Sequence, residues 1–322
     1  MKNPLKMGAL IAGLLALWIH LPPSLAAGAG PYTLATGGEQ GCYHAVGSSI
    51  ARLAKEKRAL DLQVKPSHGS VENIQAVLAG KADFGLAQSD RVLQARQGKA
   101  EWQDKGPQGN LRAVAGLYNE SLVLIASAGS GVKECRDLRG KKIAVGKPGS
   151  GMRQNAVDAL ESCNLTLKDL ALAAPINAEE ALRELQAGKL DAFFYTAGHP
   201  NRIVKQAVKG KVKVRLIGFP DVCRDRSFCY VKSWISLDLY PGLLNKGYEL
   251  QTCGVKAVLV ASAKTPDKVV YKLMELLGQN LDQVKAMHPS LRRLELHDMV
   301  DDLHAPLHPG AERYFQEKGL VK

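Results

Sequence analysis

The sequence predicts an α/β protein built from two similar units in which parallel strands alternate with helices. The segments Ser70–Asp90 and Ala178–Pro200 share a glutamate, an amphipathic helix, the pattern Ala-Gly-Lys-x-Asp and an apolar strand. Gly80 and Gly188 match with an offset of 108 residues. A second strand–glycine–helix unit precedes each segment. This alternation predicts two parallel sheets with helical crossovers.

The first residues are predicted to be a signal peptide. Lys2 and Lys6 precede the apolar run Met7–Leu21, and Ser24-Leu25-Ala26 places small residues where a signal peptidase reads them. The run is shorter than the ~20 residues of a spanning helix. We therefore expect cleavage after Ala26 or Ala27, and export, rather than a transmembrane anchor.

Composition limits the class of partner. Cleavage after residue 26 leaves 296 residues, enough for two domains with their own cores, and a net charge of +10. The lysines are scattered and aromatic residues are only 6% of the chain, so no nucleic-acid partner is expected. A basic surface of this kind favours long-range attraction of an acidic small molecule.

The six cysteines predict disulfides, because their number is even and export is expected. No pair has the spacing of a zinc site, so no structural metal is expected. Cys135 precedes the first strand of the second unit and Cys163 ends the helix that returns from it, so we predict that these two pair. Cys223 and Cys229 are close enough for a small loop, while Cys42 and Cys253 stay unassigned.

The opening strand Tyr32–Ala35 runs into a glycine loop and then a helix. Such a loop leaves backbone N–H groups free at the helix N-terminus, where they hold an anion. Thr36 stands where the first glycine of a dinucleotide fingerprint belongs, and no Gly-Lys-Ser/Thr follows. The loop is either a tight turn or a ligand contact made through Gly38–Gly41 and Tyr43.

The second unit repeats this arrangement in Lys141–Cys163. Gly149 lies 39 residues before Gly188, the distance that separates Gly41 from Gly80. Ser150 and Gly151 offer a hydroxyl and N–H groups to an anion facing the first loop. A guanidinium near a helix start opposes the helix dipole, so Arg153 either points to solvent or grips a carboxylate with two parallel hydrogen bonds.

Polar residues that follow the repeated strands fall at the carboxyl edge of the sheets, where ligands of such folds bind. Ser70 reads as an N-cap with Asn73 at the third helical position. The other candidates at this edge, each read as either a cap or turn residue or a ligand contact, are Gln88, Ser89, Asp90, Thr196, Gly198, His199 and Tyr240.

Two strand-like segments, Leu111–Ser130 and Tyr248–Ser262, join the two units without a long helix and so predict a hinge. The first lobe is expected to comprise residues 27–121 and 256–322, and the second lobe residues 122–255. A helix is predicted over residues 265–287, with Thr265 as N-cap and Pro266 in the first turn. A short helix follows at residues 307–319.

In the order and spacing of several motifs, the chain resembles the TAXI group of substrate-binding proteins that serve TRAP transporters. The motifs are TGGEQGCYHAVGSSIA, GSVENIQAVLAGKADFGLAQSD, GKPGSGMRQNA, FFYTAGHP, YPG and LHPGAERYFQEKG. The resemblance covers nearly the whole mature chain. Two positions depart from the group's pattern: Tyr43 stands without a second tyrosine, and Met152-Arg153 replaces threonine and an acid.

The resemblance implies a two-lobed, type II-like periplasmic-binding-protein fold that closes on a small organic anion in the cleft between its lobes. The implied ligand is an amino acid such as glutamate, or a dicarboxylate, and the implied partner is a TRAP-type membrane permease. We expect a periplasmic monomer without a cofactor. The expected ligand-binding residues are Gly38, Gln40, Gly41, Tyr43, Ser70, Asn73, Gln88, Ser89, Asp90, Ser150, Gly151, Arg153, Thr196, Gly198, His199 and Tyr240.

Two other classes of function also have features of the sequence in their favour. Cys42 beside His44 has the residue types of a nucleophile and its base, but no third residue to orient the base is evident. An enzyme is therefore not expected. A periplasmic sensor that presents its ligand-bound form to a membrane signalling protein stays open, because it needs the same closing cleft.

Overall fold

The computed structural model describes residues 31–224 and 229–322. The predicted signal peptide lies outside these residues. None of the described helices has the length and apolar character to cross a membrane. The strands and helices, in chain order, are β1 (Tyr32–Ala35), α1 (Cys42–Glu56), β2 (Leu62–Lys65), α2 (Ser70–Leu78), β3 (Phe84–Gln88), α3 (Ser89–Gln97), β4 (Leu111–Ser127), β5 (Lys142–Ala144), α4 (Gly151–Glu161), β6 (Leu172–Ala174), α5 (Ala178–Gln186), β7 (Ala192–Ala197), α6 (Arg202–Lys209), β8 (Val214–Gly218), β9 (Val231–Ser236), β10 (Glu249–Ser262), α7 (Asp267–Gln279), α8 (Leu281–Met287) and α9 (Pro309–Glu317).

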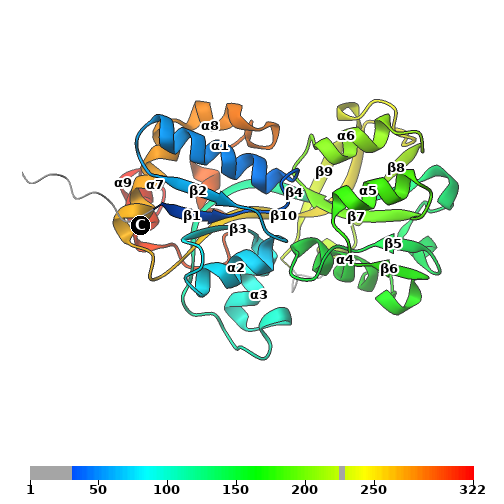
Figure 1. Cartoon of the computed structure of the whole chain (residues 1–322), viewed down its shortest axis with the longest axis horizontal. Coiled ribbons are helices and arrows are strands. Elements are labelled where there is room, and N and C mark those ends of the chain that lie inside the picture. The colour runs from blue at the N-terminus through cyan, green and yellow to red at the C-terminus, as the bar shows by residue number, and fades with distance from the viewer. Residues whose placement is uncertain (1–30, 225–228) are drawn as a thin grey trace, which may run out of the picture. The chain divides into compact units, whose positions relative to one another are not determined.

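The described strands form one mixed sheet in the order β2-β1-β3-β10-β4-β7-β5-β6, with β8 paired to β4 and β9 to β10. The parallel groups β1–β3 and β5–β7 are those expected from the repeat. The two long strands β4 and β10 pair antiparallel with each other and join the groups (Figure 1). The structure thus has one continuous sheet where the sequence suggested two separate ones.

The repeated aspartates explain part of the internal repeat. In the first unit, the Asp83 carboxylate accepts a 2.7 Å hydrogen bond from the backbone N–H of Thr33. In the second unit, the Asp191 carboxylate accepts a 2.8 Å bond from the N–H of Lys142. Each aspartate therefore ties the strand it precedes to the neighbouring parallel strand.

The glycines of the repeat end their helices as predicted. Gly80 and Gly188 have φ values of 68° and 73°, in the left-handed region that glycine occupies without steric cost. After α2, the N–H of Lys81 donates to the Ala76 carbonyl at 2.8 Å and closes the helix end.

Two predicted N-caps are wrong. Gly69, not Ser70, is the N-cap of α2, because the Ser70 hydroxyl is turned to accept the N–H of Gln88 at 3.1 Å. Pro266, not Thr265, is the N-cap of α7.

The helix predicted over residues 265–287 is also interrupted. It breaks at Asn280, whose side-chain amide donates to the Leu276 carbonyl at 2.8 Å. The apolar stripe predicted for its first part, which includes Leu273 and Leu277, is nevertheless buried.

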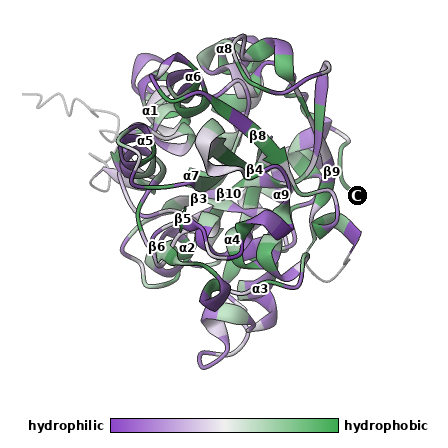
Figure 2. Ribbon diagram, turned by 90° about the vertical axis from the view of Figure 1, so that its right-hand side faces the viewer, coloured by the Kyte–Doolittle hydropathy of each residue, from purple (hydrophilic) through white to green (hydrophobic). Residues whose placement is uncertain are grey.

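The hydrophobic core consists of separate clusters that share the two long strands. Along β4, Leu117 and Tyr118 pack in one cluster, while Leu122 and Leu124 pack in another. Figure 2 shows hydrophobic central strands inside a more hydrophilic periphery. The predicted lobe boundaries, after residues 121 and 255, remain a proposal, and this change of cluster is in line with it.

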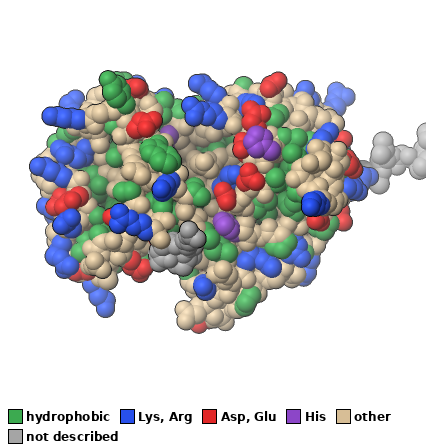
Figure 3. All heavy atoms as spheres, turned by 180° about the vertical axis from the view of Figure 1, so that it is seen from behind, with side chains coloured by type: hydrophobic (Ala, Val, Ile, Leu, Met, Phe, Trp, Pro, Cys, Tyr) green, Lys and Arg blue, Asp and Glu red, His purple; other side chains and the backbone are tan. Residues whose placement is uncertain are grey.

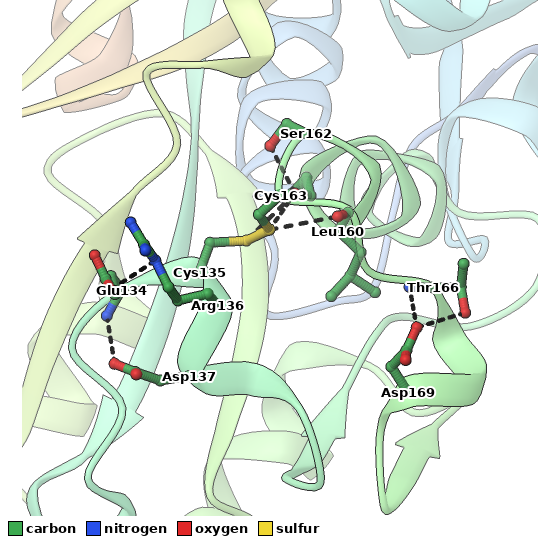
Figure 4. The surroundings of a disulfide bond; sticks show 10 residues. Glu134, Cys135, Arg136, Asp137, Leu160, Ser162, Cys163, Thr166 and Asp169 are labelled. Atoms are coloured by element: carbon green, nitrogen blue, oxygen red, sulfur yellow. Dashed lines mark hydrogen bonds and ion pairs between the residues drawn. A yellow bond between two sulfur atoms is a disulfide. The ribbon is translucent and has the colours of Figure 1, made fainter.

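The predicted disulfide between Cys135 and Cys163 is confirmed, with Cα atoms 6.2 Å apart (Figure 4). The suggested pairing of Cys223 with Cys229 is wrong. Cys223 pairs instead with Cys253, whose Cα lies 5.7 Å away. Cys253 lies on β10 next to the turn after β8, where the N–H of Cys223 also contacts its sulfur. The disulfide partner of Cys223 is therefore set by which segments meet in the sheet and not by closeness along the chain.

Candidate functional site

A cavity of about 150 Å³ lies where the glycine loops of both repeated units meet. The first unit contributes residues around Gly38 and Gly69, and the second contributes residues around Gly151 and Ala178. Thr196, at the end of β7, completes the wall. The two loops that the sequence singled out as anion sites therefore border one cavity.

Four helix N-termini converge on this cavity: those of α1, α2, α4 and α5. The N-caps of α1 and α2, Gly41 and Gly69, provide no side-chain hydrogen bond to the first turn. Ser150 and Asn177 cap α4 and α5 and accept one N–H each. Because each terminus carries partial positive charge and N–H groups without helical partners, the cavity wall favours an anion.

Glycine is required at two positions of this wall. Gly69 has a φ of 121°, which places its backbone where a side chain is strained. Gly151 allows a close approach, because a Cβ atom there would lie 1.6 Å from Gln88 Oε1 and 2.9 Å from Ser70 Oγ. The absence of a side chain at Gly151 thus lets α4 pack directly against residues of the first unit.

Two nearly fully buried side chains that line the cavity each have an oxygen without a hydrogen-bond partner among the described residues. Gln88 is 4% exposed, and its Oε1 atom is unpaired although its Nε2 donates to Asn155 at 2.9 Å. Thr196 is 8% exposed, and its Oγ1 atom is unpaired. Buried polar atoms normally have partners, so these two oxygens mark places for ligand or water.

A buried carboxyl group also lines the cavity. Glu120, on β4, accepts a 2.8 Å hydrogen bond from the Tyr43 hydroxyl on α1. Burial raises the pKa of Glu120 to about 8, although the hydrogen bond from Tyr43 opposes the shift. The group therefore changes its charge close to neutral pH, inside the cavity.

The lysine at the cavity is held by an acid. Lys147 Nζ lies 3.5 Å from a carboxylate oxygen of Glu180, and both side chains are about one-third exposed. On the face shown in Figure 3, Lys and Arg side chains are spread over the surface rather than gathered in one patch. Lys147 and the helix N-termini are thus positive groups that border the cavity.

Half of the sixteen predicted ligand-binding residues line the cavity. These residues are Gly38, Gly41, Tyr43, Ser70, Gln88, Ser150, Gly151 and Thr196. The other eight, which do not line it, are Gln40, Asn73, Ser89, Asp90, Arg153, Gly198, His199 and Tyr240. Ligand contact itself remains a prediction for all of them.

Several predicted site residues outside the cavity wall form hydrogen bonds with the backbone instead. Asn73 is fully buried, and its amide donates to the carbonyls of Thr36 and Leu86 at 2.5 and 2.7 Å. The hydroxyl of Ser89 accepts the N–H of Lys256 at 3.0 Å. These polar groups are used in folding the first unit.

Tyr240 forms a small buried cluster with its neighbours. Its hydroxyl accepts the N–H of Asn201 at 2.6 Å and lies 2.5 Å from Nδ1 of His199. Burial lowers the pKa of His199 to about 4, so its ring is neutral at physiological pH.

Arg153 lies away from the cavity wall. Its backbone N–H donates to the cap Ser150 at 3.2 Å, and its guanidinium is 3.5 Å from the Gly146 carbonyl. The guanidinium is thus directed back toward the loop that precedes α4, to which Gly146 belongs.

The sequence reasoning missed Glu120, Glu179 and Tyr195, which also line the cavity. Glu120 is an acidic residue in the middle of a long strand, between apolar runs, and an acid at such a position is a usable signal for a buried functional group. Glu179 follows the N-cap of α5, so its position was available from the cap pattern of the second unit.

Cys42 lines the cavity, but its surroundings do not resemble those of a nucleophile. His44 faces Thr36 at 3.3 Å, so the suggested pair of Cys42 with His44 does not form. The Cys42 sulfur lies instead 3.7 Å from His288. Burial raises the pKa of the Cys42 thiol to about 12, which keeps it protonated and weakly nucleophilic.

Among the described residues, no group of three His, Cys, Asp or Glu side chains is arranged to hold a metal ion. The cavity wall offers N–H groups, hydroxyls, two side-chain amides, one lysine, one histidine and carboxyl groups. This set of groups suits a small organic molecule with an anionic end.

Comparison with known proteins places this geometry in context. The model of the NMT1-like family matches residues 34–319. The chain is similar in structure to the periplasmic binding protein BugD, with a TM-score of 0.58, 15% identity and coverage of 91% of this chain and 98% of that one. It is also similar to PhnD1 from Prochlorococcus marinus MIT 9301, with a TM-score of 0.55, 9% identity and coverage of 90% and 98%. The fold is thus the two-lobed fold of periplasmic binding proteins, and the chain belongs to the NMT1-like family.

Proposed function

We propose that this protein is a periplasmic solute-binding protein that captures a small carboxylate by closure of its two lobes and delivers it to a TRAP-type transporter. The observation that carries the proposal is the convergence of four helix N-termini on one cavity. Helix N-termini from both repeated units contribute, so a bound anion contacts both sides only when the units are close together. Closure is then coupled to binding.

The carboxylate end of the ligand fits the N–H groups of the glycine loops. The backbone N–H groups at the N-termini of α1 and α4 and the ammonium group of Lys147 are donors that border the cavity. A second end of the ligand meets Glu120 and Gln88. Glu120 accepts an ammonium group when ionised and donates to an oxygen when protonated, so both an amino acid and a dicarboxylate are compatible with it.

Closure is proposed to occur about the two long strands. Glu120 and Ser121 of β4 lie opposite Val255 and Gly254 of β10, where the proposed lobes meet. A small change of twist in this antiparallel pair moves one lobe relative to the other without breaking either parallel group. Glu120 therefore lies at both the cavity and the proposed hinge.

The transporter, the TAXI assignment and the periplasmic location rest on the sequence motifs and the predicted signal peptide. A sensor for a membrane signalling protein is the alternative, since it needs the same closing cleft. A role as an enzyme is not proposed, because the thiol at the cavity is held protonated and the predicted base faces away from it.

The proposal is tested by native mass spectrometry of the purified protein, followed by a thermal-shift screen of amino acids and dicarboxylates. A ligand that binds only the folded protein raises its melting temperature by mass action. Calorimetry then gives the affinity of each hit. Stabilisation by uncharged compounds, with none by carboxylates, would reject the proposed ligand class.

A further inference from the structure

A buried cluster of charges lies behind the cavity. The Arg91 guanidinium contacts Asp90 at 2.9 Å and Asp158 at 3.5 Å, and all three side chains are at most 1% exposed. Glu101 is 3.8 Å away and 29% exposed. Asp90 and Arg91 belong to the first turn of α3, while Asp158 belongs to α4. The cluster therefore joins the first repeated unit to the second.

Two neutral side chains extend the network, and their hydrogen bonds have a fixed direction. Asn155 donates its amide to Asp90 at 2.8 Å and to the Tyr230 hydroxyl at 2.6 Å. The Tyr230 hydroxyl in turn donates to Asp158 at 2.8 Å. Because an ionised Asp90 only accepts, the atom of Asn155 that faces it must be nitrogen. The Asn155 oxygen is then left to accept from Gln88.

This last bond connects the cluster to the cavity. Gln88 lines the cavity, and its Nε2 atom is 2.9 Å from the Asn155 oxygen. The Gln88 amide comes from the first unit and Asn155 from the second, so the bond also crosses between them. Separation of the units would break it together with the contacts of Arg91 to Asp158.

We propose that the network of Asp90, Arg91, Asn155, Asp158 and Tyr230 is a latch between the two lobes. The network forms only when the lobes are closed, and Gln88 connects it to the cavity. The proposal rests on the closing motion of the proposed function. It adds that part of the closing contact is made by the protein itself, away from the ligand, and that this contact holds part of the ligand-free wild type in the closed form.

The energetics favour a latch that works only when complete. Burying charges costs several kcal/mol for each ion in general, and a buried pair offsets this cost only with good geometry and full hydrogen bonding. Removing one partner leaves an uncompensated buried charge, which is strongly unfavourable. When the lobes separate, water solvates the same groups. An incomplete cluster therefore favours the open form.

The test measures the radius of gyration of ligand-free protein by small-angle scattering, with native mass spectrometry to establish that no ligand is bound. Arg91→Leu leaves Asp90 and Asp158 facing each other without a cation, so its radius should exceed that of the wild type. Adding Asp158→Asn removes the repulsion across the lobes, so the double variant should return toward the wild-type radius. Arg52→Leu, at an exposed ion pair within α1, is the matched control and should match the wild type.

If Arg91 stabilised only the first unit, Asp158→Asn in the second unit would not reverse the effect of Arg91→Leu on the radius. A folded Arg91→Leu variant with the wild-type radius, or a double variant as open as the single one, overturns the latch. If Arg91→Leu does not fold, Asn155→Ala takes its place: a larger radius supports the latch and an unchanged one overturns it. These comparisons use no ligand, so their outcome can be distinguished from that of the ligand screen that tests the proposed function.

Discussion

The Tyr43 hydroxyl donates a 2.8 Å hydrogen bond to the Glu120 carboxyl group inside the cavity, joining the first turn of α1 to the middle of β4. This bond occupies one carboxyl oxygen and places a titratable group between the anion-favouring loops and the proposed hinge. The charge of Glu120 therefore affects the stability of the protein and the kind of ligand that the cavity accepts.

Glu120→Gln is expected to flatten the dependence of stability on pH. Burial raises the pKa of Glu120 from 4.5 to about 8, so the folded protein binds a proton that the unfolded chain releases between these values. The free energy of unfolding of the wild type should fall as pH rises from about 5 to 8, by at most about 1.4 kcal/mol per pH unit from this group. Urea unfolding at pH 5 and pH 8 measures the slope. An equal slope in both proteins would exclude Glu120 as its source.

The titration of Glu120 predicts that ligand binding changes the number of protons bound to the protein. An amino acid places an ammonium group near Glu120 and favours its ionised form, so binding near pH 7.5 should release protons. A dicarboxylate favours the protonated form, so its binding should take protons up. Calorimetry in buffers of different ionisation enthalpy measures the number. In Glu120→Gln the exchange should disappear, and its persistence would place the titrating group elsewhere.

Gly151→Ala is expected to weaken ligand binding while leaving each lobe folded. The added methyl group would lie 1.6 Å from Gln88 Oε1, so the lobes cannot approach without a shift. Overpacking of this kind typically costs about 1–3 kcal/mol, which should be lost from the binding free energy measured by calorimetry. Gly129→Ala is the matched control, because no atom beyond the two adjacent residues lies within 4 Å of the new methyl group. Equal affinities in the two variants would show that the Gly151 contact is not needed for binding.

The repeat made the fold largely predictable, because matched glycines and aspartates fix where helices end and parallel strands pair. Gly80 ends its helix and Asp83 ties two parallel strands together, and the sequence pattern around each residue is enough to predict its role. The two long strands were harder, because their pairing joins segments more than 100 residues apart. The pairing predicted for Cys223 was wrong for a related reason: only 30 residues separate it from Cys253, but the two meet only once the sheet has formed.

The site was predictable where backbone N–H groups form it and less so where side chains do. A glycine loop before a helix specifies free N–H groups whatever the tertiary structure, so Gly41 and Gly151 were found. The direction of a side chain depends on helix register and on buried partners. Asp90 is directed toward Arg91 and Asn155, and this could be known only after α3 and α4 had been placed together.

Loss of the Cys135–Cys163 disulfide is expected to lower stability by roughly 3 kcal/mol, because the bond closes a loop of 28 residues in the unfolded chain. The double variant Cys135→Ser/Cys163→Ser should show this loss in urea unfolding. Cys223→Ser/Cys253→Ser is the natural comparison, since its separation of 30 residues predicts a similar loss. Peptide mapping that finds Cys135 as a thiol in the native protein would reject the pairing.

Lys147→Ala is expected to weaken binding of a carboxylate more than Arg153→Ala does. Lys147 borders the cavity and needs only to leave Glu180 to reach an anion there, whereas the Arg153 guanidinium lies beside the Gly146 carbonyl. A hydrogen bond to a charged group typically contributes about 1.5–3 kcal/mol, so calorimetry should record a loss of that size for Lys147→Ala and a smaller one for Arg153→Ala. Both variants remove one positive charge, so each controls for the long-range field of the other. The reverse order would mean that Arg153 turns into the cavity when the ligand binds, and would restore it as the carboxylate partner that its place after the second glycine loop suggested.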